Sequence, residues 1–286
     1  MTVAQAITAG RSELDGARAL VNCAIAQYQP VRSFVLFSGG QDSTVLAHWA
    51  TTTLRDGIDA LVFIDTGTAL PGVREFAGDL ADLVNARLLV YEAGDAYTQL
   101  VLELGGFPGP AGHERAYQRL KERCIRQLVR EHKTKRSDRV MLLTGKRTAE
   151  SSRRSRTTAG IERNGAQLYV NPLMAWGDDF VRDYRVRHRL PQSDVAALLH
   201  RSGECNCGAF AAKGEREMLR SLFPAWWQRT IAPLETEARR RGITACVWGR
   251  RPPGPPPLQQ TAPACAGCRL RMERETHTVD ATQRAA

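Results

Sequence analysis

Short apolar runs alternate with amphipathic stretches along the first 175 residues of the chain. Each run is rich in β-forming residues, and the runs begin at residues 33, 60, 87 and 139 with the sequences SFVLF, ALVFI, RLLVY and RVMLL. The stretches between them, like SELDGARALVNCAIAQY before the first, space their apolar residues as a helix does. Strands that alternate with helices predict an α/β fold, with a doubly wound, mainly parallel sheet covered by helices on both faces.

The pattern changes twice further along the chain. After about Trp176 only helical patterns follow, and after Gly242 comes a stretch, GRRPPGPPPLQQTAPACAGC, that is too rich in proline for a core element. The sequence therefore divides into four predicted parts. These are an N-terminal helix at 1–30, an α/β domain at 31–175, a helical region at 176–242, and a Pro/Arg-rich tail with a Cys-x-x-Cys pair at 243–286.

The first apolar run is broken by a polar, glycine-rich stretch and then resumes, as FVLFSGGQDSTVLAHWA from residue 34. Because a strand precedes the break and a helix follows it, the break is a tight turn at the carboxyl end of a strand, where open parallel sheets bind ligands. Glycines allow a ligand to approach the backbone, and unpaired N–H groups at a helix start attract anions. We therefore predict a phosphate cradle formed by Ser38, Gly39, Gly40, Gln41, Asp42 and Ser43.

The order of residues distinguishes this cradle from other phosphate loops. It has neither the lysine of the Walker pattern nor the three spaced glycines of the dinucleotide pattern. Ser-Gly-Gly-x-Asp-Ser instead resembles the PP-loop of the adenine nucleotide alpha-hydrolase superfamily, whose members cleave ATP between the α and β phosphates. The resemblance implies a HUP-like fold, ATP with Mg²⁺ as the bound nucleotide, and a catalytic role for Asp42.

Three later blocks resemble one branch of that superfamily, the phosphoadenosine-phosphosulfate (PAPS) reductase-like proteins. They are FIDTGTALPGVREF from residue 63, TGKRTAESSRRSR from residue 144 and NPLMAW from residue 171, and the likeness extends from Ser33 to Cys207. In the first block, Asp65, Thr66 and Gly67 follow the second predicted strand, where a carboxylate can hold Mg²⁺ or a ribose hydroxyl. A helix cap before PGVREF is the structural alternative.

The second block places five basic residues directly after the fourth predicted strand. Beside the phosphate cradle they can neutralise the charge that develops on a leaving pyrophosphate, and a solvated basic loop is the alternative. In the family, this block contacts the phosphate or sulfate end of the substrate. Glu150 and Ser151 match the family's Glu-Ser pair. We expect Arg147, Arg153 and Arg154 to be catalytic, and Gly145, Lys146, Glu150 and Ser151 to bind the nucleotide.

Two close cysteine pairs indicate a metal site. Cys205 and Cys207 lie where family members often carry a Cys-x-x-Cys pair, and Cys265 and Cys268 form a second pair in the tail. Four thiolates can hold zinc or a 4Fe-4S iron–sulfur cluster, and the spacing does not decide between them. The resemblance offers Cys124 as a substitute for one tail ligand. We expect the other two, Cys23 and Cys246, to be buried small residues.

The chain carries a formal charge of +10 at pH 7. Much of the excess is arginine, which suits forked contacts with phosphate, so nucleotides or nucleic acid are expected partners; solubility alone is the alternative. Trp226 and Trp227 suit stacking on bases, although a helix packing edge is the simpler interpretation. Because no apolar run approaches about 20 residues and the start lacks a signal-like core, we expect a cytoplasmic protein with no membrane partner.

The resemblance leaves several activities open. PAPS reductases attack sulfate with a cysteine near the carboxyl terminus, and the final stretch ERETHTVDATQRAA has none. The leading hypothesis is an ATP pyrophosphatase that adenylates an acceptor for sulfur transfer, as in DNA phosphorothioation, with a separate desulfurase as sulfur donor. The alternatives are a sulfonucleotide (PAPS or APS) reductase that uses another thiol, such as Cys124, and a non-catalytic nucleic-acid-binding protein.

Overall fold

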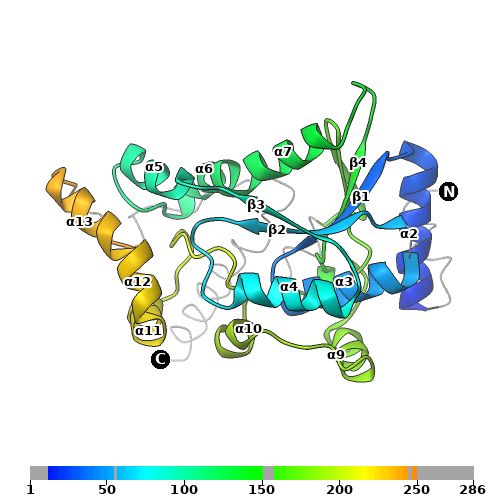
Figure 1. The fold of residues 1–286 in the computed structure, drawn as a ribbon. Helices are drawn as coiled ribbons and strands as arrows, with labels where there is room; N and C mark the ends of the chain where they lie inside the picture. Colours follow the sequence, from blue (N-terminus) through cyan, green and yellow to red (C-terminus); the bar gives the residue numbers. More distant parts are fainter. Residues whose placement is uncertain (1–11, 55–56, 151–157, 244–246, 250–286) are drawn as a thin grey trace, which may run out of the picture.

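The computed structural model describes residues 12–54, 57–150, 158–243 and 247–249, without the side chain of residue 150. Its centre is a six-stranded sheet with the strand order β3-β2-β1-β4-β6-β5 (Figure 1). Neighbouring strands are parallel except for β5, which is antiparallel to β6. The strands are β1 (Arg32–Phe37), β2 (Ala60–Asp65), β3 (Leu88–Glu92), β4 (Val140–Leu143), β5 (Ile161–Asn164) and β6 (Gln167–Val170).

Helices cover both faces of this sheet. In Figure 1, α5, α6 and α7 lie above the sheet, and α3 and α4 lie below it. The α-helices are α2 (Glu13–Tyr28), α3 (Gln41–Leu54), α4 (Val73–Leu83), α5 (Ala96–Glu103), α6 (His113–Tyr117), α7 (Arg123–Glu131), α9 (Asp178–Arg187), α10 (Asp194–Leu199), α11 (Glu215–Leu222), α12 (Pro224–Thr230) and α13 (Ala232–Arg240). Short 3-10 turns occur at η2 (Pro110–Gly112) and η4 (Thr148–Glu150), and a π-helical turn, η3 (Gln118–Glu122), joins α6 to α7.

The predicted fold class is confirmed: the sheet is mainly parallel and doubly wound. All four predicted apolar runs are strands, and they occupy the neighbouring positions β3, β2, β1 and β4. The β5–β6 hairpin was not predicted, because β5 has the polar sequence IERN and shows no apolar run. After Trp176 the described residues form helices α9 to α13 and connecting loops, as the pattern predicts.

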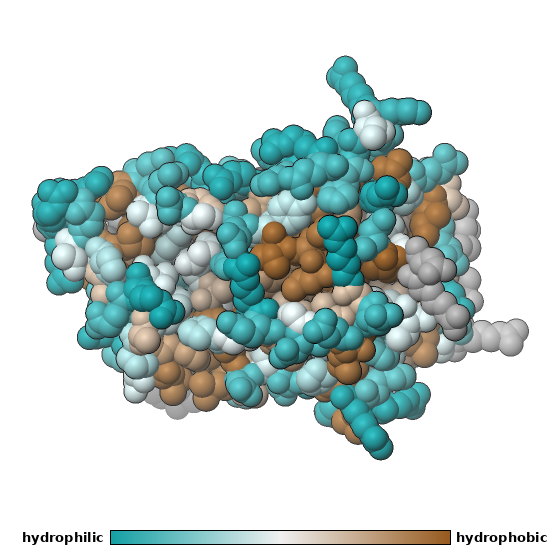
Figure 2. Space-filling model, in the orientation of Figure 1, coloured by the Kyte–Doolittle hydropathy of each residue, from teal (hydrophilic) through white to brown (hydrophobic). Residues whose placement is uncertain are grey.

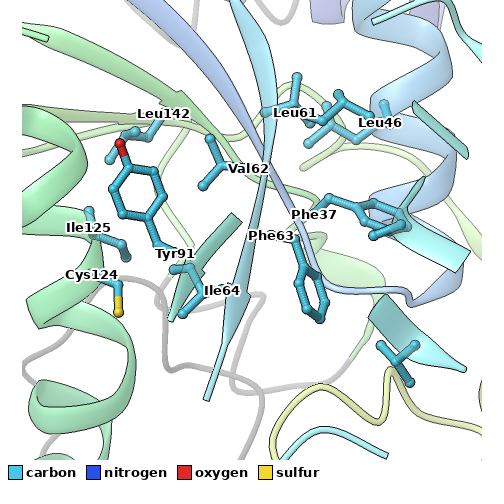
Figure 3. Close-up of a cluster of buried hydrophobic side chains, with 14 of the residues drawn as sticks. Phe37, Leu46, Leu61, Val62, Phe63, Ile64, Tyr91, Cys124, Ile125 and Leu142 are labelled. Atoms are coloured by element: carbon cyan, nitrogen blue, oxygen red, sulfur yellow. The ribbon is translucent and has the colours of Figure 1, made fainter. Parts of the chain in front are cut away.

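The core lies on both sides of β2, as expected for a central strand of a parallel sheet. Figure 3 shows its side chains alternating: Leu61 and Phe63 point toward one layer, and Val62 and Ile64 point toward the other. On the second side they meet the layer that contains α7. Because both sides are dry and packed, the polar groups that can act on a ligand are confined to the ends of the strands.

The C-terminal helices are packed onto this core rather than held apart from it. Trp176 is fully buried against Phe180 of α9. Trp226 and Trp227 are 3% and 2% exposed, so these rings belong to a packing edge and are not presented for stacking on bases. No helix in the described part of the chain is long and apolar enough to cross a membrane.

Candidate nucleotide site

The predicted phosphate cradle lies between β1, which ends at Phe37, and α3, which begins at Gln41. The strand order runs outward from β1 to β2 in one direction and to β4 in the other, so the loop lies at the topological switch point of the sheet. Gly39 has a φ of 79°, a left-handed conformation that glycine adopts without strain. The N-terminus of α3 therefore points its unpaired N–H groups and its positive dipole end toward this loop.

The two serines of the motif hold the loop together. The Oγ of Ser38 donates to the Oγ of Ser43 at 3.2 Å, and the backbone N–H of Ser38 donates to the same oxygen at 3.3 Å. Ser43 in turn donates to the carbonyl of Gly40 at 2.9 Å. These contacts fix the shape of the cradle, so the serines have a structural task in addition to the predicted phosphate contacts.

Gly145 packs directly against the start of α3. A Cβ atom at this position would lie 3.1 Å from the carbonyl carbon and oxygen of Asp42 and 3.2 Å from the backbone nitrogen of Ser43. A Cβ atom this close to backbone atoms would force the neighbouring backbone to shift. The absence of a side chain at Gly145 therefore lets the loop after β4 contact the phosphate cradle. The structure thus brings the phosphate cradle and the TGKRTAESSRRSR block together at neighbouring strand ends.

Arg147 is buried beneath the cradle and is only 6% exposed. Its Nε donates to Oδ1 of Asp42 at 2.9 Å, and its Nη1 donates to Oδ1 of Asp178 at 2.9 Å and to the carbonyl of Trp176 at 3.1 Å. One guanidinium therefore connects the start of α3 with the start of α9. The contact of Asp178 with Arg147 was not predicted from the sequence, because the two residues are far apart along the chain.

Lys146 is also buried, but it points to a different group. Its Nζ donates to Oε1 of Glu162 on β5 at 3.3 Å, and the same oxygen accepts from Nδ2 of Asn171 at 3.4 Å. Thr144 and Asn171 form a further hydrogen bond between the ends of β4 and β6. Lys146 and Arg147, neighbours in the sequence, thus serve two separate polar clusters.

The three residues predicted to act after β2 have different surroundings: Asp65 offers a carboxylate, whereas Thr66 and Gly67 shape the loop. Oδ1 of Asp65 accepts from the backbone of Gly67 at 2.9 Å, and its Oδ2 lies 3.4 Å from Nη1 of Arg74. Gly67 has a φ of 73°. Thr66 is fully buried, and its hydroxyl donates to the carbonyl of Glu204 at 2.7 Å. The cap of α4 is Gly72, so Asp65 is not the residue that begins this helix.

A segment of which the sequence marked only Cys205 and Cys207, residues 193–207, lies against the cradle. Ser193 donates to the carbonyl of Gly39 at 3.3 Å, and the Cβ of Ser202 lies 3.3 Å from where a Cβ of Gly40 would be. Asn206 is 1% exposed. Its Oδ1 accepts a hydrogen bond from Arg201, and its Nδ2 donates to the carbonyls of Thr68 and Gly203. This segment, which we name the strap, fastens the cradle to the loop after β2.

The strap carries the first predicted cysteine pair. Cys205 is half-buried and Cys207 is buried, and the carbonyl of Cys207 accepts from the Tyr97 hydroxyl at 3.0 Å. Trp248, near the start of the predicted tail, donates from Nε1 to the carbonyl of Asn206 at 2.8 Å, so the chain returns to the strap there. Among the described residues no three His, Cys, Asp or Glu side chains come together as a metal site.

Cys124 has the surroundings of a packed core residue. It is 1% exposed, and Figure 3 shows it beside Ile125 on the side of α7 that faces Ile64. Its Sγ donates to the carbonyl of Leu120 at 3.6 Å. Burial raises the pKa of this thiol, so the neutral form is favoured. Cys23 is likewise buried, as predicted.

Several predicted site residues lie outside the described part of the chain. They are Ser151, Arg153, Arg154, Cys265 and Cys268, together with the side chain of Glu150. Cys246, which was predicted to be a buried small residue, also lies outside the described residues. Their predicted roles therefore stay predictions.

A comparison with protein families identifies the class to which this fold and cradle belong. The model of the phosphoadenosine phosphosulfate reductase domain matches residues 32–200, which is more than half of the chain. The chain therefore belongs to the phosphoadenosine phosphosulfate reductase domain family, and the predicted resemblance is confirmed. This membership supports a nucleotide-utilising enzyme with a sulfur-related function.

The solved structures that this chain resembles include a reductase, a thiolase and a synthetase. One is the PAPS reductase of Candida auris in a phosphate complex, with 17% identity, a TM-score of 0.47, and coverage of 64% of this chain and 84% of that one. Another is the U34-tRNA thiolase NcsA of Methanococcus maripaludis with its [4Fe-4S] cluster, with 11% identity, a TM-score of 0.48, and coverage of 88% and 87%. NMN synthetase of Francisella tularensis has 15% identity, a TM-score of 0.47, and coverage of 78% and 95%. No curated protein sequence matches this chain.

Proposed function

We propose that the protein is an ATP pyrophosphatase that cleaves ATP to AMP and pyrophosphate and so adenylates an acceptor, on the way to sulfur transfer. The observation that carries the proposal is the Ser-Gly-Gly-x-Asp-Ser loop at the switch point of the sheet, with Gly145 packed against it. A loop of this shape at a helix N-terminus suits the phosphates of a nucleotide. The family match supports a sulfur-related use of that nucleotide.

In this mechanism the chain supplies positioning and charge. The backbone N–H groups at the start of α3 bind the phosphates, and Asp42 and Asp65 hold the Mg²⁺ that accompanies the nucleotide. Arg147 orients Asp42 through its 2.9 Å contact with Oδ1. Arg153 and Arg154, from the basic block, neutralise the charge that grows on the leaving group.

The bonds change at the α-phosphorus. An oxygen of the acceptor forms a new bond to it, and the bond from that phosphorus to the oxygen bridging toward the β-phosphorus breaks. Pyrophosphate leaves with the bonding electron pair, and AMP stays attached to the acceptor. A sulfur nucleophile, supplied by a separate desulfurase, then bonds to the acceptor atom that carries this oxygen, and AMP leaves with the oxygen and the bonding electron pair. The acceptor we favour is nucleic acid, as in DNA phosphorothioation.

The cysteine pairs provide the ligands for a metal group in this proposal. Cys205 and Cys207 lie in the strap, and the described chain returns to the strap at Trp248 before it continues toward Cys265 and Cys268. A soft set of four thiolates fits a 4Fe-4S cluster or zinc. An iron–sulfur cluster bound there supplies electron or sulfur chemistry, and zinc supplies a structural cross-link. Cys124, on the buried side of α7, is the poorer candidate for a substitute ligand.

The burial of Cys124 also bears on the reductase alternative. A thiol that attacks sulfate must be an exposed thiolate. Cys124 is packed in the apolar core, and its pKa is raised by burial, so its surroundings oppose that role. We therefore rank the sulfonucleotide reductase below the ATP pyrophosphatase, and we rank the non-catalytic nucleic-acid binder third.

The deciding experiment is pyrophosphate release from ATP by the wild type and by Asp42→Ala and Asp42→Asn variants. We expect release by the wild type and a loss of at least about a hundredfold in both variants, in line with the loss of a group that stabilises the transition state. Asp179→Asn, an exposed acid at the start of α9, is the matched control and should leave the rate unchanged. Unchanged turnover in a folded Asp42→Ala protein would exclude the mechanism, and release of sulfite from PAPS would favour the reductase.

A further inference from the structure

Positive charge is concentrated in one part of the chain. Residues 113–139, which form α6, η3, α7 and the loop before β4, contain ten Lys or Arg and four Asp or Glu, a formal charge of +6. The whole chain carries +10. A tenth of the sequence therefore holds more than half of the net charge.

The charge lies on one side of α7 because this helix is amphipathic. Its inner side chains, Cys124, Ile125, Leu128 and Val129, are buried against the sheet. Its outer side is basic, and Figure 2 shows hydrophilic side chains covering this part of the surface. We name the exposed cations of α7 and the following loop the basic ridge; they are Arg123, Arg126, Arg130, Lys135 and Arg136.

Nearby acids neutralise only part of the ridge. Arg126 forms an ion pair with the buried Glu122 at 3.0 Å. Glu131 is exposed at the end of the helix, where it accepts from the Tyr91 hydroxyl. Arg130, Lys135 and Arg136 make no side-chain hydrogen bond or ion pair with any other residue that the structure describes. Arg130 does interact electrostatically with Glu131, and Lys135 with Asp138. We leave Arg115 and Arg119 out of the ridge because Glu103 binds both.

The ridge leads to the nucleotide site. At its beginning, Arg123 donates to the carbonyl of Ala93, the residue after β3, and Lys121 forms an ion pair with Glu204 of the strap. At its other end, the carbonyl of Arg139, just before β4, accepts from the backbone N–H of Val31, just before β1. The ridge thus runs along one face of the sheet, from the carboxyl edge to the amino edge.

The surface is unlike a protein-binding site. Interfaces between proteins usually have an apolar centre, and none of the exposed large hydrophobic side chains in the described part of the chain belongs to residues 113–139. Four of the five ridge cations are arginines, whose forked guanidinium groups match phosphate oxygens. Arg126 and Arg130 lie one helical turn apart, about 6 Å along the axis, and so offer evenly spaced contacts.

We propose that the basic ridge binds the phosphodiester backbone of a nucleic acid and guides it to the carboxyl edge of the sheet, where the nucleotide site lies. The identity of this nucleic acid as the adenylated acceptor rests on the proposed function, but its binding does not. Backbone contacts of this kind are independent of base sequence, and they weaken as salt rises because bound counter-ions are released.

The test measures the affinity of the full chain for a fluorescent 30-base-pair DNA duplex, for one of its single strands and for an RNA of the same length, across a range of salt concentrations. The ridge variant is Arg130→Gln/Lys135→Gln/Arg136→Gln. Its control removes three exposed arginines from other elements, as Arg163→Gln/Arg187→Gln/Arg229→Gln, with the same change in net charge. The ranking of the three probes shows which nucleic acid the ridge prefers.

We expect the ridge variant to bind the preferred probe at least about tenfold more weakly and to lower the slope of log affinity against log salt by roughly 2 to 3, as the loss of three phosphate contacts implies. The control should stay within about twofold of the wild type. No binding of any probe, equal weakening in the two variants, or equal competition by inorganic polyphosphate would overturn the proposal. ATP cleavage measured without nucleic acid, which the ridge variant should retain, and DNA binding by Asp42→Ala separate this result from the fate of the proposed function.

Discussion

A buried guanidinium needs acceptors on several sides, because an unpaired charge in the interior costs several kcal/mol. Arg147 meets this need with two carboxylates and one carbonyl, all within 3.1 Å. Only one of these acceptors, Asp42, belongs to the phosphate loop. Asp178 is 72% exposed and can be changed without leaving a new charge in the core. It therefore offers a way to disturb the orientation of Asp42 from outside the nucleotide site.

We expect Asp178→Asn to lower kcat/KM for ATP several-fold and to raise the Mg²⁺ concentration needed for half-maximal rate, because Arg147 is then held less firmly against Asp42. A charged hydrogen bond contributes about 1.5–3 kcal/mol at most, and the exposure of Asp178 reduces this value. Asp179→Asn should change neither quantity, since the ion pair of Asp179 is with Arg182 and not with Arg147. Steady-state pyrophosphate release at varied Mg²⁺ checks this. Equal effects of the two substitutions would contradict a positioning role for Asp178.

At the scale of elements, the sequence predicted the features that depend on a local residue pattern, namely the strands and the phosphate loop. Four strands were predicted because their apolar runs are bounded by polar turns, and the phosphate loop was predicted because its six residues interrupt such a run. The β5–β6 hairpin escaped because β5 has no apolar pattern, and the strap escaped because Ser193, Ser202 and Asn206 act through contacts with residues more than 130 positions earlier. Polar residues of this kind give no periodic signal.

Side chains connect α3 with α9 and its C-terminal cap at two separate places. Near one end, Asp42 and Asp178 share Arg147. Further along, the Nδ1 of His48 lies 2.9 Å from the Tyr184 hydroxyl, and the rings of His48 and His188 are 4.7 Å apart. The pKa of His48 is lowered from its ordinary value of 6.5, first by burial and then by the nearby His188. Burial raises the pKa of Tyr184 to about 12, so that group stays neutral across the relevant range.

This lowered pKa predicts a pH dependence of stability. The unfolded chain takes up a proton at His48 near pH 6.5, whereas the folded chain resists it until the pH is lower, so the free energy of unfolding falls as the pH drops below about 6.5. The stabilisation is fully present above that pH. We expect His48→Gln to be less sensitive to acid between pH 7 and pH 5.5 than the wild type. Urea unfolding at a series of pH values measures this, and parallel curves for the two proteins would contradict the assignment.

At the scale of the whole molecule, the strap gathers separate parts of the chain around the cradle. It contacts the phosphate loop through Ser193, and the loop after β2 through Asn206. Trp248 brings the C-terminal part of the described chain to the same place, and its backbone N–H donates to Glu235 of α13. From Gly249 the chain has 16 residues to reach Cys265, which is ample length to return to Cys205 and Cys207.

This arrangement predicts a metal site that needs both cysteine pairs. Iron and zinc content per chain, measured after anaerobic purification, should fall to background in Cys205→Ser/Cys207→Ser and equally in Cys265→Ser/Cys268→Ser, because a pair alone offers only two of the four thiolates that a cluster or a structural zinc requires. Cys23→Ala, which alters a buried thiol on α2, should keep the metal. If the tail pair can be removed without loss of metal, the four-thiolate assignment is wrong and the strap cysteines must find other partners. If both cysteine-pair variants lose the metal and Cys23→Ala keeps it, the tail is a functional part of the molecule. Trp248 would then hold one end of the tail next to the nucleotide site, and the metal would hold the other end there.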